Sequence, residues 1–129
     1  MRLDTRLTIA IAAVVTFLLS TPVVAHHGAA AAFDVTKTIT VQGTMTEFLF
    51  VHPHVQLYFE RKNEKGEIEK WQGALTAPSK LSRAGWNKHT LQPGDQVTVS
   101  GSPAKNGSNS IWIRKLVGPK GDSLSLFEA

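Results

Sequence analysis

The chain has 129 residues, no cysteine, and 14 basic against 10 acidic residues, which gives a formal net charge of +4 with its five histidines neutral. Without cysteine the chain cannot form a disulfide or a thiolate metal site, so any bound metal would need nitrogen and oxygen ligands. Since the charge excess is small and no block of like charges occurs, the composition argues against nucleic acid as a partner.

The first 25 residues resemble a secretory signal peptide. Arg2 and Arg6 provide a short basic start, and the uncharged run over 7–19 is shorter than the ~20 apolar residues that a membrane-spanning helix needs. Small residues precede the end of this segment, so we expect cleavage after Ala25; the alternative is a cut within 29–32. The mature chain would then be periplasmic or secreted, with no stable membrane span after processing.

Removing 25 of the 129 residues leaves 104, which suits one domain rather than two. The small residues that follow the cleavage site predict a flexible N-terminal segment over 26–37. We therefore expect three parts: a signal peptide over 1–25, this flexible segment, and a single OB-like β-barrel domain over 38–129.

Alternating apolar and polar residues predict a run of β-strands with one short helix. Gly43 is expected to form a bulge or a sharp bend in the first strand, and Val55, Leu57 and Phe59 should point inward from the second. Pro78 and Gly85 suit the first turn and the C-terminal stop of a helix. The expected strands cover 38–46, 54–60, 67–75, 97–101 and 110–117, and the helix covers 77–85.

This order, β-β-β-α-β-β, predicts a mainly β fold: a small OB-fold-like five-stranded barrel with its helix between the third and fourth strands. A β-sandwich with an incidental helix is the alternative. OB barrels usually bind ligands on strands two and three and on the loop that joins strands one and two. Here that loop covers 50–54. The outward row of the second strand is His54, Gln56 and Tyr58, with Trp71 as a candidate neighbour on the next strand.

The remaining residues of chemical interest favour a binding protein over an enzyme. No two carboxylates form a pattern that specifies paired acid and base work, and the serines lack a nucleophile-elbow context. His89 lies in a polar connection and is expected at the surface. Packing in the core or at the barrel ends is expected for all three tryptophans, Trp71, Trp86 and Trp112.

Several short motifs stand out in the mature chain: His26-His27-Gly28, Ala32-Phe33-Asp34, Pro53-His54-Val55, Arg83-Ala84-Gly85-Trp86 and the run over 91–101. They resemble those of a family of small secreted bacterial proteins of unknown function. In that family a His-His pair follows the signal peptide and a Pro-His step follows the first strand. The resemblance covers nearly the whole mature chain and implies secretion and a single compact domain, but no activity. In the family, Asn more often precedes the proline of the Pro-His step, whereas this chain has His52 at that position.

Cleavage after Ala25 would place His26 and His27 at a new amino terminus. In a histidine brace, the terminal amine and the Nδ1 atom of the first His chelate copper, and the Nε2 atom of a distant His completes three nitrogen ligands. His26 would supply the chelate and His54 the distant imidazole. His27 is an alternative chelator, through the amine and a backbone amide, and His52 is a reserve ligand.

The sequence thus predicts a small secreted or periplasmic binding protein with copper as its cofactor. The alternative is a non-catalytic OB-type module whose outward face binds a small polar ligand, an oligosaccharide or another envelope protein. A third hypothesis is an oxidative copper enzyme, because an open three-nitrogen site could also activate oxygen. The alternative to all of the metal hypotheses is that the His-His start has no role and that His54 only hydrogen-bonds a loop carbonyl.

Overall fold

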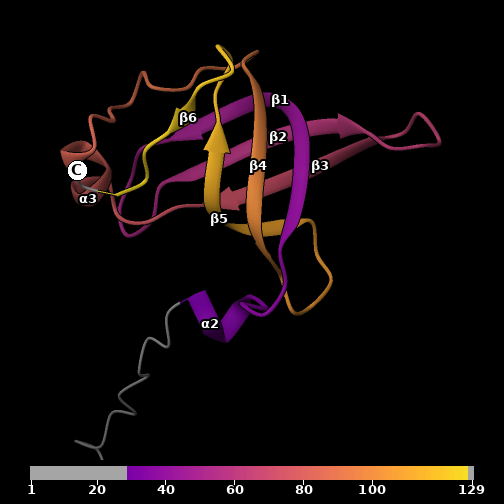
Figure 1. Ribbon diagram of the computed structural model, residues 1–129. Coiled ribbons are helices and arrows are strands. Elements are labelled where there is room, and N and C mark those ends of the chain that lie inside the picture. The colour runs from indigo at the N-terminus through magenta and orange to yellow at the C-terminus, as the bar shows by residue number, and fades with distance from the viewer. Residues whose placement is uncertain (1–28, 128–129) are drawn as a thin grey trace, which may run out of the picture.

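The computed structural model describes residues 29–127, which form one six-stranded sheet, one short helix on its side and one helical turn at its start (Figure 1). None of the helices in this range is long and apolar enough to cross a membrane. The elements in chain order are α2 (Ala29–Ala32), β1 (Ile39–Leu49), β2 (Gln56–Lys62), β3 (Ile68–Ala74), α3 (Pro78–Arg83), β4 (Gln96–Pro103), β5 (Ser110–Val117) and β6 (Ser123–Leu124).

The first five strands close into a barrel. The strand order is β3-β2-β1-β4-β5-β6, and an additional parallel pairing of β3 with β5 joins the two ends of the five-stranded part. All other neighbours in the sheet run antiparallel. This topology, with α3 between β3 and β4, is that of an OB-fold and confirms the predicted mainly β barrel. A sandwich of two separate sheets is excluded for this part of the chain.

The predicted inward face of the second strand is confirmed. Val55, Leu57 and Phe59 are almost completely buried, whereas Gln56 and Tyr58 between them are half-exposed. Period-two alternation therefore assigned this face correctly, because one side of each strand packs into the barrel and the other meets solvent. The same alternation holds in β5, where Ile111 and Ile113 are buried and Trp112 and Arg114 lie outside.

Strand β1 changes partners along its length, which lets the sheet coil into a barrel. Its first half pairs with β4 and its second half with β2, and Thr44 pairs with both. The bulge expected at Gly43 lies instead between Met45 and Glu47. Gly43 has a different role: a Cβ atom there would lie 2.6 Å from the carbonyl oxygen of Glu60, so only glycine allows β1 and β2 to approach so closely.

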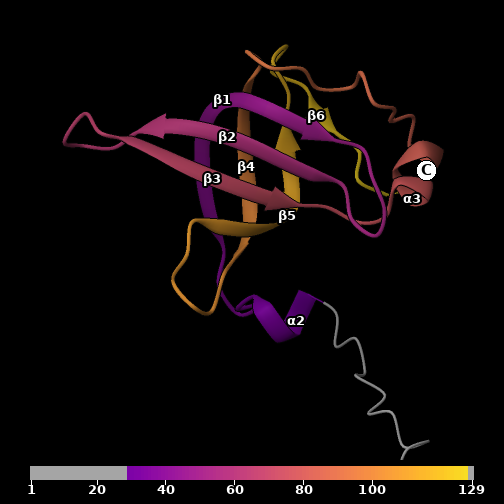
Figure 2. The same cartoon turned by 180° about the vertical axis from the view of Figure 1, so that it is seen from behind.

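The helix α3 and the C-terminal segment cover one end of the barrel. Leu81 of α3 is fully buried, and Gly85 at the end of the helix has a φ of +92°, as a C-terminal stop requires. The helix is thus confirmed close to its predicted bounds. Trp86, just beyond it, is buried and donates a hydrogen bond from Nε1 to the carbonyl oxygen of Ser125 at 2.7 Å. The hairpin between β2 and β3 projects beyond the barrel on the opposite side (Figure 2).

The described part of the N-terminal segment is attached to the loop between β4 and β5. Phe33 forms an isolated bridge with Ala104, and the amide of Asp34 donates to the carbonyl oxygen of Pro103 at 2.8 Å. The amide of Lys105 donates to the carbonyl oxygen of Ala32 at 2.9 Å. This attachment holds Phe33 at the barrel surface beside the β4–β5 loop, and the residues that precede Phe33 join the barrel there.

Candidate functional site

The outward faces of β2, β3 and β5 form one continuous surface. Trp112 of β5 pairs with Ala74 of β3, and Ala74 pairs in turn with Gln56 of β2. Because directly paired residues point to the same side of a sheet, these three residues form a row across the outside of the barrel. Trp112 is half-buried and is the large aromatic residue of that row.

His54 lies at one end of this surface, in the loop between β1 and β2. Its side chain is exposed, and its ring meets Trp112 edge-on, with ring centroids 5.4 Å apart and an interplanar angle of 87°. Edge-to-face contacts of this kind are favourable, and this one restricts how the imidazole can turn. His52 is exposed in the same loop, and the peptide bond between His52 and Pro53 is cis.

Phe33 of the N-terminal segment contacts the same tryptophan. The ring centroids of Phe33 and Trp112 are 6.1 Å apart, at an interplanar angle of 46°. Trp112 therefore joins two segments that are distant in the sequence: the start of the described chain and the loop that carries His54. Trp112 was expected to pack in the core or at a barrel end, but it lies on the outward side of β5 and is not part of the core cluster. The sequence contains no sign of this convergence, because neither contact depends on local periodicity.

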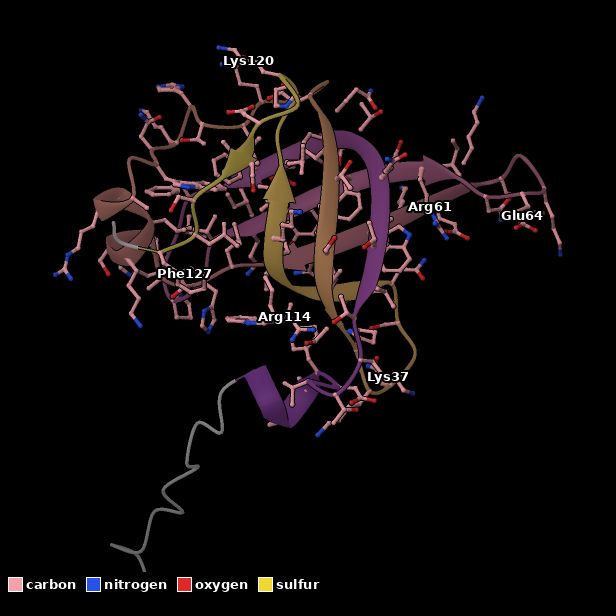
Figure 3. All side chains as sticks on the ribbon, viewed as in Figure 1. Lys37, Arg61, Glu64, Arg114, Lys120 and Phe127 are labelled. Carbon is pink, nitrogen blue, oxygen red and sulfur yellow. The ribbon has the colours of Figure 1, made fainter. Side chains whose placement is uncertain are left out.

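Hydrogen bonds hold the segment between α2 and β1 in place. Arg114 of β5 points toward this segment, and its Nη2 atom donates to the carbonyl oxygen of Lys37 at 3.0 Å and to the hydroxyl of Thr38 at 2.5 Å (Figure 3). The hydroxyl and the amide of Thr36 both donate to one carboxylate oxygen of Asp34, and these bonds lower the pKa of Asp34. Hydrogen bonds from Arg114 and within the turn therefore hold the segment that places Phe33 against Trp112.

Gln56, Tyr58 and Gln72 form a hydrogen-bonded group on the same outward surface. The Tyr58 hydroxyl donates to Gln56 Oε1 at 3.0 Å, and Gln72 Nε2 donates to the same oxygen at 2.6 Å. Gln72 Nε2 also lies 3.3 Å from the Tyr58 hydroxyl oxygen. The outward neighbour of Tyr58 on β3 is therefore Gln72, its direct strand partner, and not Trp71.

Trp71 lies on the other face of the sheet, so its expected place beside the outward row was wrong. It pairs with Phe59 of the core, and the two rings stack with centroids 6.3 Å apart at 19°. Its packing role was predicted correctly: it packs against the core cluster, as does the buried Trp86. The carbon Cζ of Arg61 lies 5.5 Å from the centroid of the Trp71 ring.

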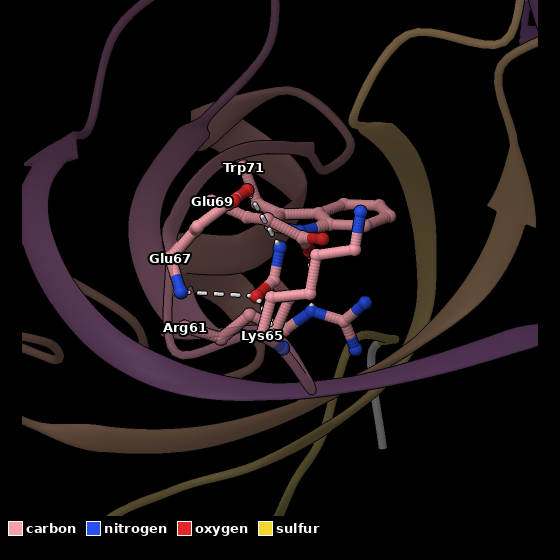
Figure 4. Close-up of polar contacts among 6 residues, drawn as sticks. Arg61, Lys65, Glu67, Glu69 and Trp71 are labelled. Atoms are coloured by element: carbon pink, nitrogen blue, oxygen red, sulfur yellow. Dashed lines mark hydrogen bonds and ion pairs between the residues drawn. The ribbon is translucent and has the colours of Figure 1, made fainter.

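Arg61, Glu69 and Trp71 form a charged cluster where the hairpin leaves the barrel (Figure 4). Arg61 Nε donates to Glu69 Oε2 at 2.7 Å, and Trp71 Nε1 donates to the same oxygen at 3.2 Å. These bonds, the one from Arg61 above all, lower the pKa of Glu69. The cluster lies on the hairpin side of the barrel, away from α3.

We expect Arg61→Gln to raise the pKa of Glu69 toward the usual carboxyl value of 4.5. Because the folded-state pKa of Glu69 is lowered, this group stabilises the fold above its usual pKa and loses that contribution as the pH falls through the lowered value. Carboxyl ¹³C NMR titration measures the shift directly. Lys62→Gln, which removes the neighbouring exposed cation, is the matched control; an equal rise in both variants would contradict the role of the Arg61 hydrogen bond.

The predicted metal ligands are only partly within the described chain. His54 and His52 lie in the β1–β2 loop, whereas His26 and His27 lie outside the described residues. Within 29–127, no group of three or more His, Asp or Glu side chains is placed to hold a metal ion. His89 is exposed, as predicted, and lies in the connection between α3 and β4. A three-nitrogen site at His54 would therefore need ligands from the N-terminal segment.

Comparison with known proteins places the chain in a family but assigns no activity. The model of a family of unknown function, DUF6152, matches residues 13–111. The chain belongs to this family. The family resemblance inferred from the sequence motifs, to small proteins of unknown function, is thereby confirmed.

No curated protein matches the sequence. One solved structure, described as "Crystal structure of tRNA fluorescent labeling enzyme", resembles the chain with a TM-score of 0.43 and 22% sequence identity. The match covers 66% of this chain and 18% of that one, so the chain spans less than a fifth of that protein's length.

Proposed function

We propose that the mature protein is a periplasmic or secreted copper-binding protein, in which His26 and its terminal amine chelate Cu(II) and His54 supplies a third nitrogen. One observation supports it above the others: Phe33 and His54 both contact Trp112, so the N-terminal segment starts beside the loop histidine. His27 is the alternative chelator and His52 the alternative loop ligand. This function requires removal of the leader after Ala25.

The length of the N-terminal segment is compatible with this site. Three residues, His26 to Gly28, precede α2, and extended residues advance about 3.3–3.6 Å each, whereas helical residues advance about 1.5 Å. The stretch before Phe33 can therefore span about 16 Å. The centroids of the Phe33 and His54 rings are separated by no more than the sum of their 6.1 and 5.4 Å distances to Trp112. The reach of the segment exceeds this separation.

The chemistry of the donor set suits Cu(II). A neutral amine and two neutral imidazoles are nitrogen ligands of the kind that copper prefers, and the chain has no thiolate to compete with them. Trp112 would hold the His54 ring in one orientation, as outer contacts of metal ligands commonly do. Protons compete for each nitrogen, so affinity for Cu(II) should fall as the pH is lowered.

Processing is the first requirement of this proposal, because an uncleaved chain has no amine at His26. We expect the intact mass of protein recovered from the cell envelope to match a chain that begins at His26. A mature start within 31–33 would remove both histidines and end the copper proposal. A start at His27 would retain one chelating histidine and transfer the role of His26 to it.

A second candidate function uses the outward face of the barrel without a metal. The group formed by Gln56, Tyr58 and Gln72 adjoins Trp112 through Ala74, so polar and aromatic side chains share one surface. This is the face on which OB-folds usually bind ligands. A non-catalytic module of this kind would bind a small polar ligand, an oligosaccharide or another envelope protein.

A further inference from the structure

A separate apolar groove lies between α3 and the C-terminal segment. Its larger part has a volume of about 300 Å³ and is lined by Thr76, Lys80, Leu126 and Phe127. A smaller hollow of about 80 Å³ adjoins it, shares Thr76, Leu126 and Phe127, and is also lined by Arg114 and by Trp112, the residue that contacts His54. The walls of both are mainly apolar, unlike the polar hollows along the β2–β3 hairpin and beside β4.

The apolar wall of this groove is held in place by the fold. Trp86 anchors Ser125 through the 2.7 Å hydrogen bond to its carbonyl oxygen, and Leu126 is buried against the barrel core. The Ser125 hydroxyl donates to the carbonyl oxygen of Phe127 at 2.8 Å. Phe127 nevertheless remains 75% exposed, the largest exposed fraction among the big apolar side chains of the described chain. A ligand in the groove would cover apolar surface that the protein itself leaves in water.

Basic side chains border the groove within 29–127. Lys80 lines the larger part and Arg114 the smaller, and none of the described lining residues is acidic. Within 29–127, no ion pair of Lys80 or Arg114 with a carboxylate is found, whereas Lys37 pairs with Asp34 and Arg61 with Glu69. Arg114 already donates to Lys37 and Thr38, which leaves Lys80 as the better placed cation.

We propose that this groove binds a small, soluble apolar carboxylic acid, with its carboxylate at Lys80 and its hydrocarbon body against Leu126 and Phe127. The volume of the groove falls at the lower end of the range of small-molecule sites, and apolar walls with one or two polar groups are the usual composition of such sites. The site needs neither His26 nor His54. The larger part, where the ligand is placed, does not include Trp112, so octanoate binding in the absence of metal tests this site apart from copper binding.

Octanoate, titrated into the ¹⁵N-labelled mature protein and followed by NMR, tests this site. We expect saturable shifts of the amide signals of Thr76, Lys80, Leu126 and Phe127, with the β2–β3 hairpin unaffected. Hexanoate should bind more weakly, by about fourfold per methylene removed. Octanol should also bind more weakly than octanoate, because it lacks the charge that Lys80 recognises. Non-saturable shifts, shifts confined to another face, or equal affinity for octanol would overturn the proposal.

Two variants with a matched control assign the contacts. Lys80→Gln should weaken octanoate binding about two- to fivefold, the range of an exposed ion pair, and leave octanol unaffected. Phe127→Ala should weaken both ligands. Lys120→Gln removes an exposed cation from the turn between β5 and β6, away from Phe127 in Figure 3, and should change neither. If Lys80→Gln and Lys120→Gln weakened octanoate binding equally, octanoate would be attracted to the basic protein in general and would not be bound at the proposed site.

Discussion

Adding Gly-Pro before His26 should weaken Cu(II) binding by roughly a hundredfold or more, although all five histidines remain. In the brace the amine and the His26 imidazole belong to the same residue, so the second ligand is held near the metal by the first. The added residues move the amine away from His26, and the peptide nitrogen of the added proline carries no hydrogen, so the new terminus cannot chelate through the following amide as His27 could in the mature chain. A single added residue would not make this test, because it would place His26 second in the chain, where amine, amide and imidazole still chelate Cu(II). Calorimetric titration of the untagged mature protein and of the extended variant measures the difference.

Single histidine variants separate the alternative ligand sets. His54→Ala should weaken binding less than the extension, since the remote ligand is lost while the chelate persists. His26→Ala keeps the amine, the following amide and His27, so retained tight binding in that variant would identify His27 as the chelator. The exposed His89 is the matched control, and His89→Ala should have no effect.

The opposite result would redirect the functional proposal. If the extended protein binds Cu(II) as tightly as the mature protein, the terminal amine is not a ligand and the brace is wrong. The outward surface around Trp112, Gln56 and Tyr58 would then carry the function, as in the second candidate. The fluorescence of Trp112 offers an additional readout, because this tryptophan contacts His54 and a metal bound there should change its emission. Trp112→Phe is the control, since it should remove that signal.

The sequence predicts the barrel well where the residues of a single strand show which of its faces is buried. In β2 every second residue is a large apolar one, so Val55, Leu57 and Phe59 identify the inner face without knowledge of any partner. In α3, Pro78 and Gly85 mark both ends through backbone conformations that few other residues suit as well. These features are local, and the structure reproduces them.

The sequence fails where the answer depends on a partner strand. In β3 the inner positions include Glu69, Trp71 and Gly73, which do not form an apolar row. A Cβ atom at Gly73 would lie 2.5 Å from Ile113 Cδ1, so a side chain of β5 fills the space that a residue of β3 would otherwise occupy. Glu69 pairs with Arg61, which is one residue beyond the last β2 residue that pairs with β1, so it lies where the hairpin has left the barrel. The face of Trp71 could not be assigned without the pairing to Phe59.

The candidate site depends even more on non-local contacts. Nothing in the run of small residues before Phe33 indicates that the segment returns to the β4–β5 loop, because the bonds involved join Ala32 and Asp34 to Lys105 and Pro103. The histidines were selected from the sequence by their chemistry. That the N-terminal segment and His54 meet at Trp112 follows only from the closed barrel, which brings the β1–β2 loop beside β5.

Leu57→Ala should destabilise the protein by about 2–5 kcal/mol, because it removes a fully buried side chain and leaves a cavity that the closed barrel cannot easily fill. Its neighbour Tyr58 is half-exposed and contributes a hydroxyl to the group with Gln56 and Gln72. Tyr58→Phe should therefore cost only about 0.5–1.5 kcal/mol, the usual net value of one hydrogen bond. Urea unfolding of both variants, compared at equal m-values, measures the two costs.

The ranking of these two variants tests more than stability, because a shift of one residue in the register of β2 would exchange its two faces. With Leu57 inside, His54 and Gln56 lie on the outward side, where a ligand can reach them. If Tyr58→Phe proved more damaging than Leu57→Ala, the inner and outer faces of β2 would be reversed. His54 would then be directed toward the barrel interior, and neither the copper site nor the OB-type surface could include it.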